Sequence, residues 1–327
     1  MDTKETVKKL GSFLILLSMA LRLLGDPAAV ETLKKKEVQA FLLYLETGRK
    51  VRFSPSLDEK SNHVGESAPP IVLSQPEDLP VFSPADAAMI PMTNMSGLKP
   101  DAESLLSRPL IWDLKNGAPA VLILHTHATE SYTKSGETYA ESAAFRTLAE
   151  DYNMLSIGNR VAQILSRQGI SVIHDRDLHD YPDYNSAYGN ARESICFYLE
   201  RYPSISLVLD LHRDASGDLS NQIRPLVNVG GASAAQLMIV VGTEGSGLSH
   251  PKWQENLALA LKLQVQLERL APGITRPINL RSQRFNQDLS SGALLIEVGA
   301  AGNTQAEALR AAEILAEAVA SLAKGSG

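Results

Sequence analysis

Three clusters of polar residues carry the side chains best suited to metal binding and to acid–base catalysis. The first cluster contains His127 and Glu130, which form an H-x-x-E pair. Two ligands three positions apart on a turn can reach one ion, and a distant histidine such as His212 can complete a set of three. Two imidazoles and one carboxylate suit Zn²⁺, with a fourth position open for water. Zinc would lower the pKa of that water and polarise a scissile carbonyl.

Hydrolysis at such a centre also needs a carboxylate that does not bind the metal. This group takes the proton of the water and delivers it to the leaving amine, and Glu297 is predicted for that role. Each feature also has a simpler interpretation. His212 can be an ordinary buried histidine beside Asp210, and Glu297 can be a buried carboxylate paired with Arg213 or Arg281.

The elements that must position these residues form a regular pattern after residue 110. Each cluster directly follows or ends an apolar run that predicts a buried strand, namely residues 120–124, 206–211 and 293–296. Further strands are predicted at 170–174 and 236–241, and helices at 153–168, 186–202, 253–270 and 304–323. This alternation predicts an α/β domain with a mostly parallel central sheet and helices on both faces. Ligands of such sheets bind beyond the carboxyl ends of the strands, where the three clusters would meet.

Composition excludes several classes of protein. The 327 residues are 44% hydrophobic and 21% charged, which is enough apolar material for a sizeable core. Lys and Arg total 31 against 37 Asp and Glu, so the net charge is −6 and we expect no nucleic acid partner. Because Cys196 is the single cysteine, an internal disulfide, a cysteine-based zinc finger and an Fe–S cluster are impossible.

The chain before residue 110 differs in character. Residues 1–30 hold lysines followed by an apolar run at 10–21, which fits an uncleaved membrane anchor, a cleaved signal or an amphipathic helix. We favour an anchor and an extracytoplasmic location. Residues 31–109 form an N-terminal segment and a linker, because nine of the 17 prolines lie between 54 and 109 and favour an extended spacer. Residues 110–327 are the predicted catalytic domain.

The motifs at the three clusters resemble those of the stage II sporulation protein P family. The resemblance rests on residues 122–132, 210–215, 285–289 and 294–299, and the intervening segments 153–158 and 183–188 fit as well. It extends, in order, over about 110–325. It implies a zinc-dependent peptidoglycan hydrolase of endospore-forming bacteria, similar in fold to zinc amidases and zinc carboxypeptidases. The implied reaction cleaves the N-acetylmuramoyl-L-alanine amide bond, and also peptide crosslinks, during septal thinning and engulfment. The implied partners are the other membrane proteins of the engulfment machinery.

The resemblance also implies roles for individual residues. His127 would be the first metal ligand, with His125 as the alternative, His212 the later ligand, and Glu297 the catalytic glutamate. Related amidases place a glutamate ligand just before the first long helix. In this chain an alanine holds that position with Glu150 beside it, so Glu130 is preferred as the carboxylate ligand and Glu150 stays open.

Arg213 follows the later histidine and is predicted to neutralise a substrate carboxylate or a developing oxyanion. An ion pair with Asp214 at the strand end is an equally good interpretation. Two other functions also stay open for the chain. One is a zinc carboxypeptidase or endopeptidase that acts on stem peptides without amidase activity, and the other is a non-catalytic scaffold of the engulfment machinery.

Overall fold

The computed structural model describes residues 51–53, 81–110, 112, 114, 117–133, 145–215, 217–218 and 221–324. The chain divides into two compact units, Met1–Arg52 and Phe53–Gly327, with strand β1 (Val51–Phe53) at their boundary. The predicted anchor at 1–30 lies outside the described residues. Among the described residues, no helix has the length and apolar character needed to span a bilayer.

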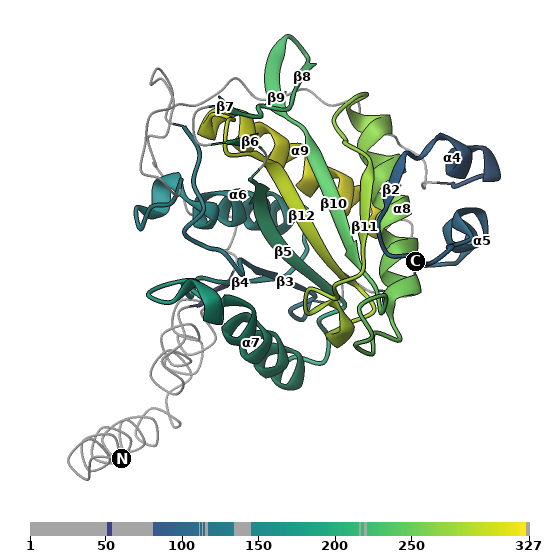
Figure 1. Ribbon diagram of the computed structural model, residues 1–327, viewed down its shortest axis with the longest axis horizontal. Coiled ribbons are helices and arrows are strands. Elements are labelled where there is room, and N and C mark those ends of the chain that lie inside the picture. Colours follow the sequence, from purple (N-terminus) through teal and green to yellow (C-terminus); the bar gives the residue numbers. More distant parts are fainter. Residues whose placement is uncertain are drawn as a thin grey trace, which may run out of the picture. The chain divides into compact units, whose positions relative to one another are not determined.

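The second unit is built on one mixed sheet. Its strands follow the spatial order β4 (Val172–Asp175), β3 (Val121–Leu124), β5 (Leu207–Asp214), β12 (Ala293–Ala300), β10 (Leu237–Gly242), β11 (Ile278–Arg281) and β2 (Met92–Asn94) (Figure 1). Neighbours pair in parallel throughout, except that β10 runs antiparallel to β12. The predicted α/β class with a mostly parallel sheet is therefore confirmed. The carboxyl ends of β3, β5 and β12 meet at one edge.

Three long helices cover one face of the sheet. They are α6 (Met154–Arg167), α8 (Trp253–Leu270) and α9 (Gln305–Lys324), and α9 packs against both of the others. Alternate strand residues such as Leu209 and Ile296 join the core beneath them. The start of α6 is fixed by Asn153, whose side chain accepts a hydrogen bond from the Leu155 N–H at 3.0 Å. Its end is fixed by Gly169, whose φ of +81° suits a residue without a Cβ.

The other face carries α7 (Ala187–Arg201), preceded by a short 3₁₀ turn η2 (Tyr184–Ser186) (Figure 1). A second turn, η3 (Gln287–Leu289), follows Phe285, which packs on Met238, Val240 and Leu295 of this face. The Phe285 ring lies 6.1 Å from that of Tyr188 on α7. The loop before η3 and the start of α7 therefore flank the same part of the sheet.

The structure differs from the predicted domain boundary at residue 110. Strand β2 pairs in parallel with β11, and helices α4 (Pro84–Met89) and α5 (Ala102–Ser107) precede the boundary as parts of the same unit. Leu105 and Leu106 of α5 belong to the main core. Proline did not prevent this, because it suits the first turn of a helix, as at Pro84, and is tolerated beside an edge strand.

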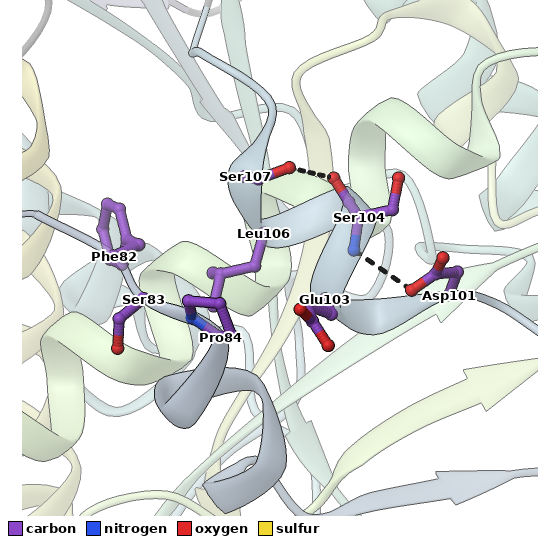
Figure 2. A pocket seen from close by; sticks show the side chains of 8 residues that line it. All are labelled: Phe82, Ser83, Pro84, Asp101, Glu103, Ser104, Leu106 and Ser107. Atoms are coloured by element: carbon purple, nitrogen blue, oxygen red, sulfur yellow. Dashed lines mark hydrogen bonds between the residues drawn. The ribbon is translucent and has the colours of Figure 1, made fainter.

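Smaller elements complete the unit. They are the 3₁₀ turn η1 (Glu150–Tyr152) and two antiparallel ribbons, β6 (Gly217–Asp218) with β7 (Asn221–Gln222), and β8 (Leu226–Val229) with β9 (Ala232–Ala235). Figure 2 shows a pocket of about 490 Å³ between α4 and α5, lined by residues that include Phe82, Pro84 and Leu106. None of the three polar clusters contributes a side chain to it.

Candidate active site

Strand alternation places His212 and Glu297 side by side on the face of the sheet that carries α7. In β5, Leu209 and Leu211 pack into the core beneath the long helices, so Asp210 and His212 point to the opposite face. In β12, Glu297 lies directly opposite His212 in the parallel register. Two residues that are 85 positions apart in the sequence therefore become neighbours through strand pairing alone.

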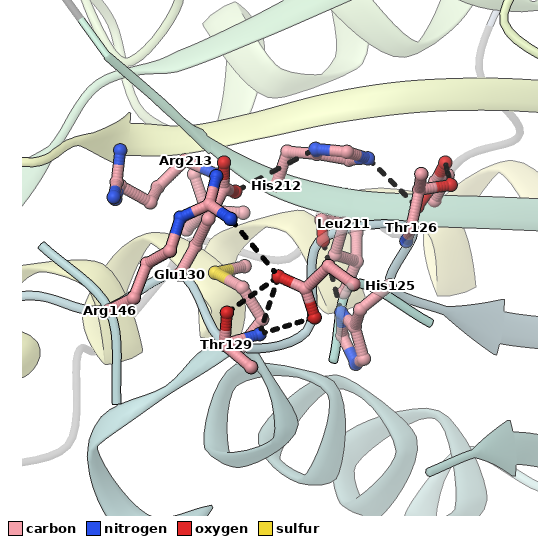
Figure 3. A network of polar contacts seen from close by, with 12 residues as sticks. His125, Thr126, Thr129, Glu130, Arg146, Leu211, His212 and Arg213 are labelled. Carbon is pink, nitrogen blue, oxygen red and sulfur yellow. Dashed lines mark hydrogen bonds and ion pairs between the residues drawn. The ribbon is translucent and has the colours of Figure 1, made fainter. Parts of the chain in front are cut away.

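The loop after β3 brings His127 and Glu130 to the same edge. The loop is anchored at Thr126, whose N–H and hydroxyl donate to the Asp210 carboxylate at 2.8 and 2.6 Å. The Glu130 N–H then donates to the His127 carbonyl at 3.2 Å, which closes a turn. As a result, Oε2 of Glu130 lies 3.7 Å from Nδ1 of His212 (Figure 3).

His127 is held among aromatic rings and is 8% exposed. Its ring stacks on Tyr184, with centroids 4.5 Å apart and an angle of 18° between the planes. The rings of Tyr188 and His212 meet it edge-on at 5.6 and 5.4 Å. Its buried Nδ1 has no hydrogen-bond partner among the described residues. Burial, followed by the positive charge of His212, lowers the pKa of His127 to about 3. The imidazole is therefore neutral at physiological pH, the form that can bind a metal.

His212 and Asp210 form a buried ion pair, with Nε2 of the histidine 3.0 Å from Oδ1 of the aspartate. Burial alone would lower the pKa of His212, but Asp210, Glu130 and Glu297 outweigh it and raise that pKa to about 10. Burial alone would likewise raise the pKa of Asp210, and His212 with the hydrogen bonds from Thr126 lowers it. Without a bound cation, the imidazolium of His212 therefore balances a group of carboxylates.

Glu297 is the least satisfied carboxylate of the group. Its Oε2 is buried and has no hydrogen-bond partner in the part of the chain that the structure describes. Burial, reinforced by the negative charges of Glu130 and Asp214, raises its pKa to about 8, although His212 opposes the shift. A carboxyl group in this condition can both hold and release a proton near neutral pH, which is what a general acid–base requires.

The two residues left open from the sequence as alternative ligands, His125 and Glu150, make contacts outside the group of proposed ligands. His125 is 1% exposed, and its ring is fixed by the Leu211 carbonyl at Nδ1 (3.0 Å) and by the His174 ring at Nε2 (2.9 Å). A Cβ at Gly158 would come within 2.5 Å of both rings, so the pair fills its space completely. Glu150 lies on η1 with its side chain 55% exposed and pairs with Arg176.

Arg213 is buried, and its side chain hydrogen-bonds to the protein backbone. It is 3% exposed, and its Nε and one terminal nitrogen donate to the carbonyls of Ser131 (3.1 Å) and Phe145 (2.7 Å). Its backbone N–H donates to Oε2 of Glu130 at 3.1 Å. Asp214 pairs with Arg276 at 2.8 Å. In this structure Arg213 fastens the loop that carries Glu130, and its predicted contact with substrate stays a prediction.

Three residues near His127 were not predicted from the sequence as parts of the site. Tyr184 and Tyr188 surround the ring of His127, and the guanidinium of Arg146 lies 4.0 Å from the ring centroid of Tyr184. The two tyrosines lie in a motif that supports the family resemblance, and this was the available signal. Arg146 belongs to no regular strand or helix and lies in an isolated bridge, so its local sequence gave no signal of a role in the site.

The chemical types of the side chains predicted as ligands are those that zinc binds in proteins. His127 and His212 offer imidazoles, Glu130 offers a carboxylate, and Nδ1 of His127 is buried without a partner. The described residues nevertheless contain no group of three or more His, Cys, Asp or Glu side chains gathered closely enough to hold an ion. Binding would therefore require these side chains to close on the metal in place of their present contacts.

A comparison of structures finds several N-acetylmuramoyl-L-alanine amidases that are similar to the chain. The N-acetylmuramyl-L-alanine amidase Ami1 from Mycobacterium smegmatis matches with 13% identity and a TM-score of 0.39, covering 64% of this chain and 99% of its own. The N-acetylmuramoyl-L-alanine amidase from Clostridium difficile 630 matches with 15% identity and a TM-score of 0.37, covering 65% and 100%. AmiC2 of Nostoc punctiforme matches with 16% identity and a TM-score of 0.36, covering 63% and 94%.

Sequence comparison is more specific. Stage II sporulation protein P of Bacillus subtilis (strain 168) is 27% identical over an alignment of 210 residues. The match covers 60% of this chain and 49% of the relative. The chain thus spans about half the length of the curated relative that it matches. The family model for stage II sporulation protein P matches residues 49–320, a range that contains the whole described sheet. The chain therefore belongs to the stage II sporulation protein P family.

Proposed function

We propose that this protein is a zinc-dependent peptidoglycan hydrolase that cleaves the N-acetylmuramoyl-L-alanine amide bond during sporulation. The observation that carries the proposal is the convergence of His127, Glu130, His212 and Glu297 at the carboxyl ends of three parallel strands. Membership of the stage II sporulation protein P family supports the biological setting. Cleavage of peptide crosslinks by the same site is a second part of the proposal.

His127, Glu130 and His212 would hold the zinc ion, which when bound activates a water molecule and polarises the scissile carbonyl. Asp210 lies 3.0 Å from His212 and would fix the orientation of that imidazole. Glu297 would take a proton from the attacking water and return it to the leaving nitrogen. Its Oε2 accepts no hydrogen bond from any described residue, so this oxygen can take the proton without first breaking such a bond.

The proposal places the catalytic unit outside the cytoplasm. Residues 1–30 would anchor the chain to the cell membrane, and the acidic net charge of −6 gives no basic surface for the wall. Targeting would then depend on partners, for which the other membrane proteins of the engulfment machinery are the candidates. Septal thinning and engulfment are the steps in which removal of stem peptides would act.

The test is digestion of purified crosslinked peptidoglycan by the zinc-loaded chain, with products followed by mass spectrometry and bound zinc by elemental analysis. We expect free stem peptides from the wild type. His212→Ala should lose zinc and activity, whereas Glu297→Gln should keep zinc and lose activity.

Other outcomes would decide against the amidase. Cleaved crosslinks without free stem peptides would leave an endopeptidase or carboxypeptidase. A chain that binds zinc but releases nothing, with wild type and Glu297→Gln behaving alike, would indicate a scaffold. Absence of both zinc and products would contradict the metal site itself.

A further inference from the structure

Arg146 lies directly opposite the proposed ligand Glu130. The two residues form an antiparallel bridge, flanked by hydrogen bonds from the Ser131 N–H to the Phe145 carbonyl (3.0 Å) and from the Thr147 N–H to the Thr129 carbonyl (2.8 Å). Residues opposite each other in an antiparallel pair project to the same side. The backbone therefore directs the side chain of Arg146 toward the side on which Glu130 lies.

The guanidinium of Arg146 is held by an aromatic stack that begins at the candidate active site. The ring of Tyr184 packs on His127 with one face, and Arg146 lies over the ring at 4.0 Å from its centroid. Tyr184 is 48% exposed, so the stack extends from the buried imidazole to the surface. Stacking fixes the plane of the guanidinium and reduces the entropy lost when it binds a ligand.

The guanidinium of Arg146 is in an ion pair, but its N–H groups make no hydrogen bond to any described residue. The ion pair is with Asp180, whose Oδ2 lies 3.6 Å from Nη1 of Arg146, beyond hydrogen-bond distance. The carboxylate of Asp180 is already used by Thr129, whose hydroxyl donates to it at 2.6 Å. The side chain of Arg146 is 25% exposed, whereas that of Asp180 is fully buried.

Other arginines near the site are engaged. Arg213 donates to two backbone carbonyls and is almost fully buried. Arg192 forms two hydrogen bonds with the carboxylate of Asp288, at 2.8 and 2.9 Å. Arg146 is thus the better placed of these arginines to meet a ligand at the edge where His127 and Glu130 lie.

We propose that Arg146 binds a free carboxylate of the stem peptide beside the bond that is cleaved, and that Tyr184 is the platform that positions its guanidinium. This inference rests on the proposed function and assigns to Arg146 the role predicted from the sequence for Arg213. A guanidinium presents a planar fork of N–H donors that matches a carboxylate in two-point geometry. A carboxamide at the same position would offer one acceptor oxygen and no charge.

The test uses the zinc-loaded full chain and two matched substrates. One is N-acetylmuramoyl-L-alanyl-D-glutamate with its γ-carboxyl group blocked as a methylamide, and the other is the same compound with the α-carboxylate as a carboxamide. We expect the wild type to prefer the acid by about tenfold in kcat/KM. Arg146→Gln should remove the preference by raising KM for the acid at nearly constant kcat, and should leave the amide unaffected.

Further variants separate recognition from folding. Arg146→Lys keeps the charge without the fork and should retain part of the preference. Tyr184→Phe should retain the preference and Tyr184→Ala should weaken it. Arg167→Gln, at the exposed far end of α6, is the matched control and should behave as the wild type. An Arg146→Gln variant with wild-type melting temperature and an undiminished preference for the acid would overturn the proposal, as would a wild type without any preference.

A binding measurement distinguishes failure of this inference from failure of the proposed function. In the Glu297→Gln background, titration calorimetry should show the acid binding about tenfold more tightly than the amide, and Arg146→Gln should abolish the difference. If the wild type cleaves neither substrate and no peptidoglycan while this difference persists, the hydrolase proposal fails and the carboxylate site stands. If cleavage occurs and the two compounds bind equally, the carboxylate site fails alone.

Discussion

Two glutamates, Glu297 within β12 and Glu307 in the first turn of α9, show how differently this fold treats the same side chain. Glu307 is 4% exposed and accepts hydrogen bonds from Arg224, Asn303 and the Thr304 N–H. Burial alone would raise its pKa, but these bonds lower it. Glu297 has an oxygen without a hydrogen-bond partner among the described residues, and burial raises its pKa to about 8.

The difference separates a carboxylate held in a hydrogen-bond network from one whose surroundings suit acid–base chemistry. Glu307 ties the first turn of α9 to Arg224 beside the β8–β9 ribbon, so every oxygen is committed. At Glu297 the fold tolerates an unsatisfied polar atom, which costs stability. A cost of this kind is typical of catalytic groups, because the missing partner is supplied by the substrate or by water.

The largest effect is expected from Glu297→Gln on activity. Loss of the proton carrier should reduce kcat on peptidoglycan by about 10²- to 10⁴-fold. Folding should be unchanged or slightly improved, because the amide removes a group whose raised pKa costs stability at neutral pH and leaves the hydrogen bonds of the site in place. Product release measured by mass spectrometry and a thermal melt test both parts. Residual activity within a few-fold of the wild type would place the proton carrier elsewhere.

Glu307→Gln should show the reverse pattern. It replaces a charged acceptor by a neutral one in a network that includes Asn303 and the half-exposed Arg224. We expect about 1–2 kcal/mol lower free energy of unfolding, after allowance for solvent screening at Arg224. Activity per folded molecule should stay near the wild type. Urea denaturation measures the first quantity, and an unchanged midpoint would mean that the network adds no net stability.

The two carboxylates should also give opposite dependences of stability on pH in the metal-free protein. Glu307 has a folded pKa below its ordinary value of 4.5, so its stabilisation is present above that pH and is lost as pH falls through the folded pKa. Glu297 has a raised folded pKa, so its contribution is largest below pH 4.5 and is lost as pH rises toward about 8.

Denaturation of the wild type and of each Glu→Gln variant across pH 3–9 checks this opposition. The disadvantage of Glu307→Gln should shrink in acid, and the advantage of Glu297→Gln should grow between about pH 4.5 and 8. Parallel curves for the two variants would show that the fold does not treat the two glutamates differently.

The smallest effect is expected from Tyr132→Phe, which tests how Glu297 is held in place. The Tyr132 hydroxyl donates to the Val298 carbonyl at 2.7 Å, beside an irregularity in the β12–β5 pairing that includes Gly299 at φ +71°. Loss of this bond should cost about 1 kcal/mol of stability and lower kcat a few-fold, with KM unchanged. A reduced stability with unchanged kcat would limit Tyr132 to a structural role.

Much of the fold could be predicted because its main elements carry strong local signals. The apolar runs at β3, β5, β10 and β12 and the helical periodicity of α6 to α9 predict those elements to within a few residues. Strands β2 and β11 were missed. Both are short, β2 lies between Pro91 and Pro100, and each is stabilised by its neighbour in the sheet rather than by its own sequence.

The sequence by itself determined which residue types stand at the carboxyl ends of β3, β5 and β12, since a strand followed by polar residues is a local pattern. Only the tertiary structure shows how the surroundings of the neighbouring histidines differ, and the assignment of His127 as the ligand stays a prediction. His125 is buried against His174, whereas His127 lies two residues on and faces His212. The tertiary structure also gives Arg213 and Arg146 different surroundings, because burial and hydrogen-bond partners come from segments distant in the chain. The side chain of Arg213 hydrogen-bonds to the loop that carries Glu130. Arg146 is held beside the site by a single backbone bridge and an aromatic stack.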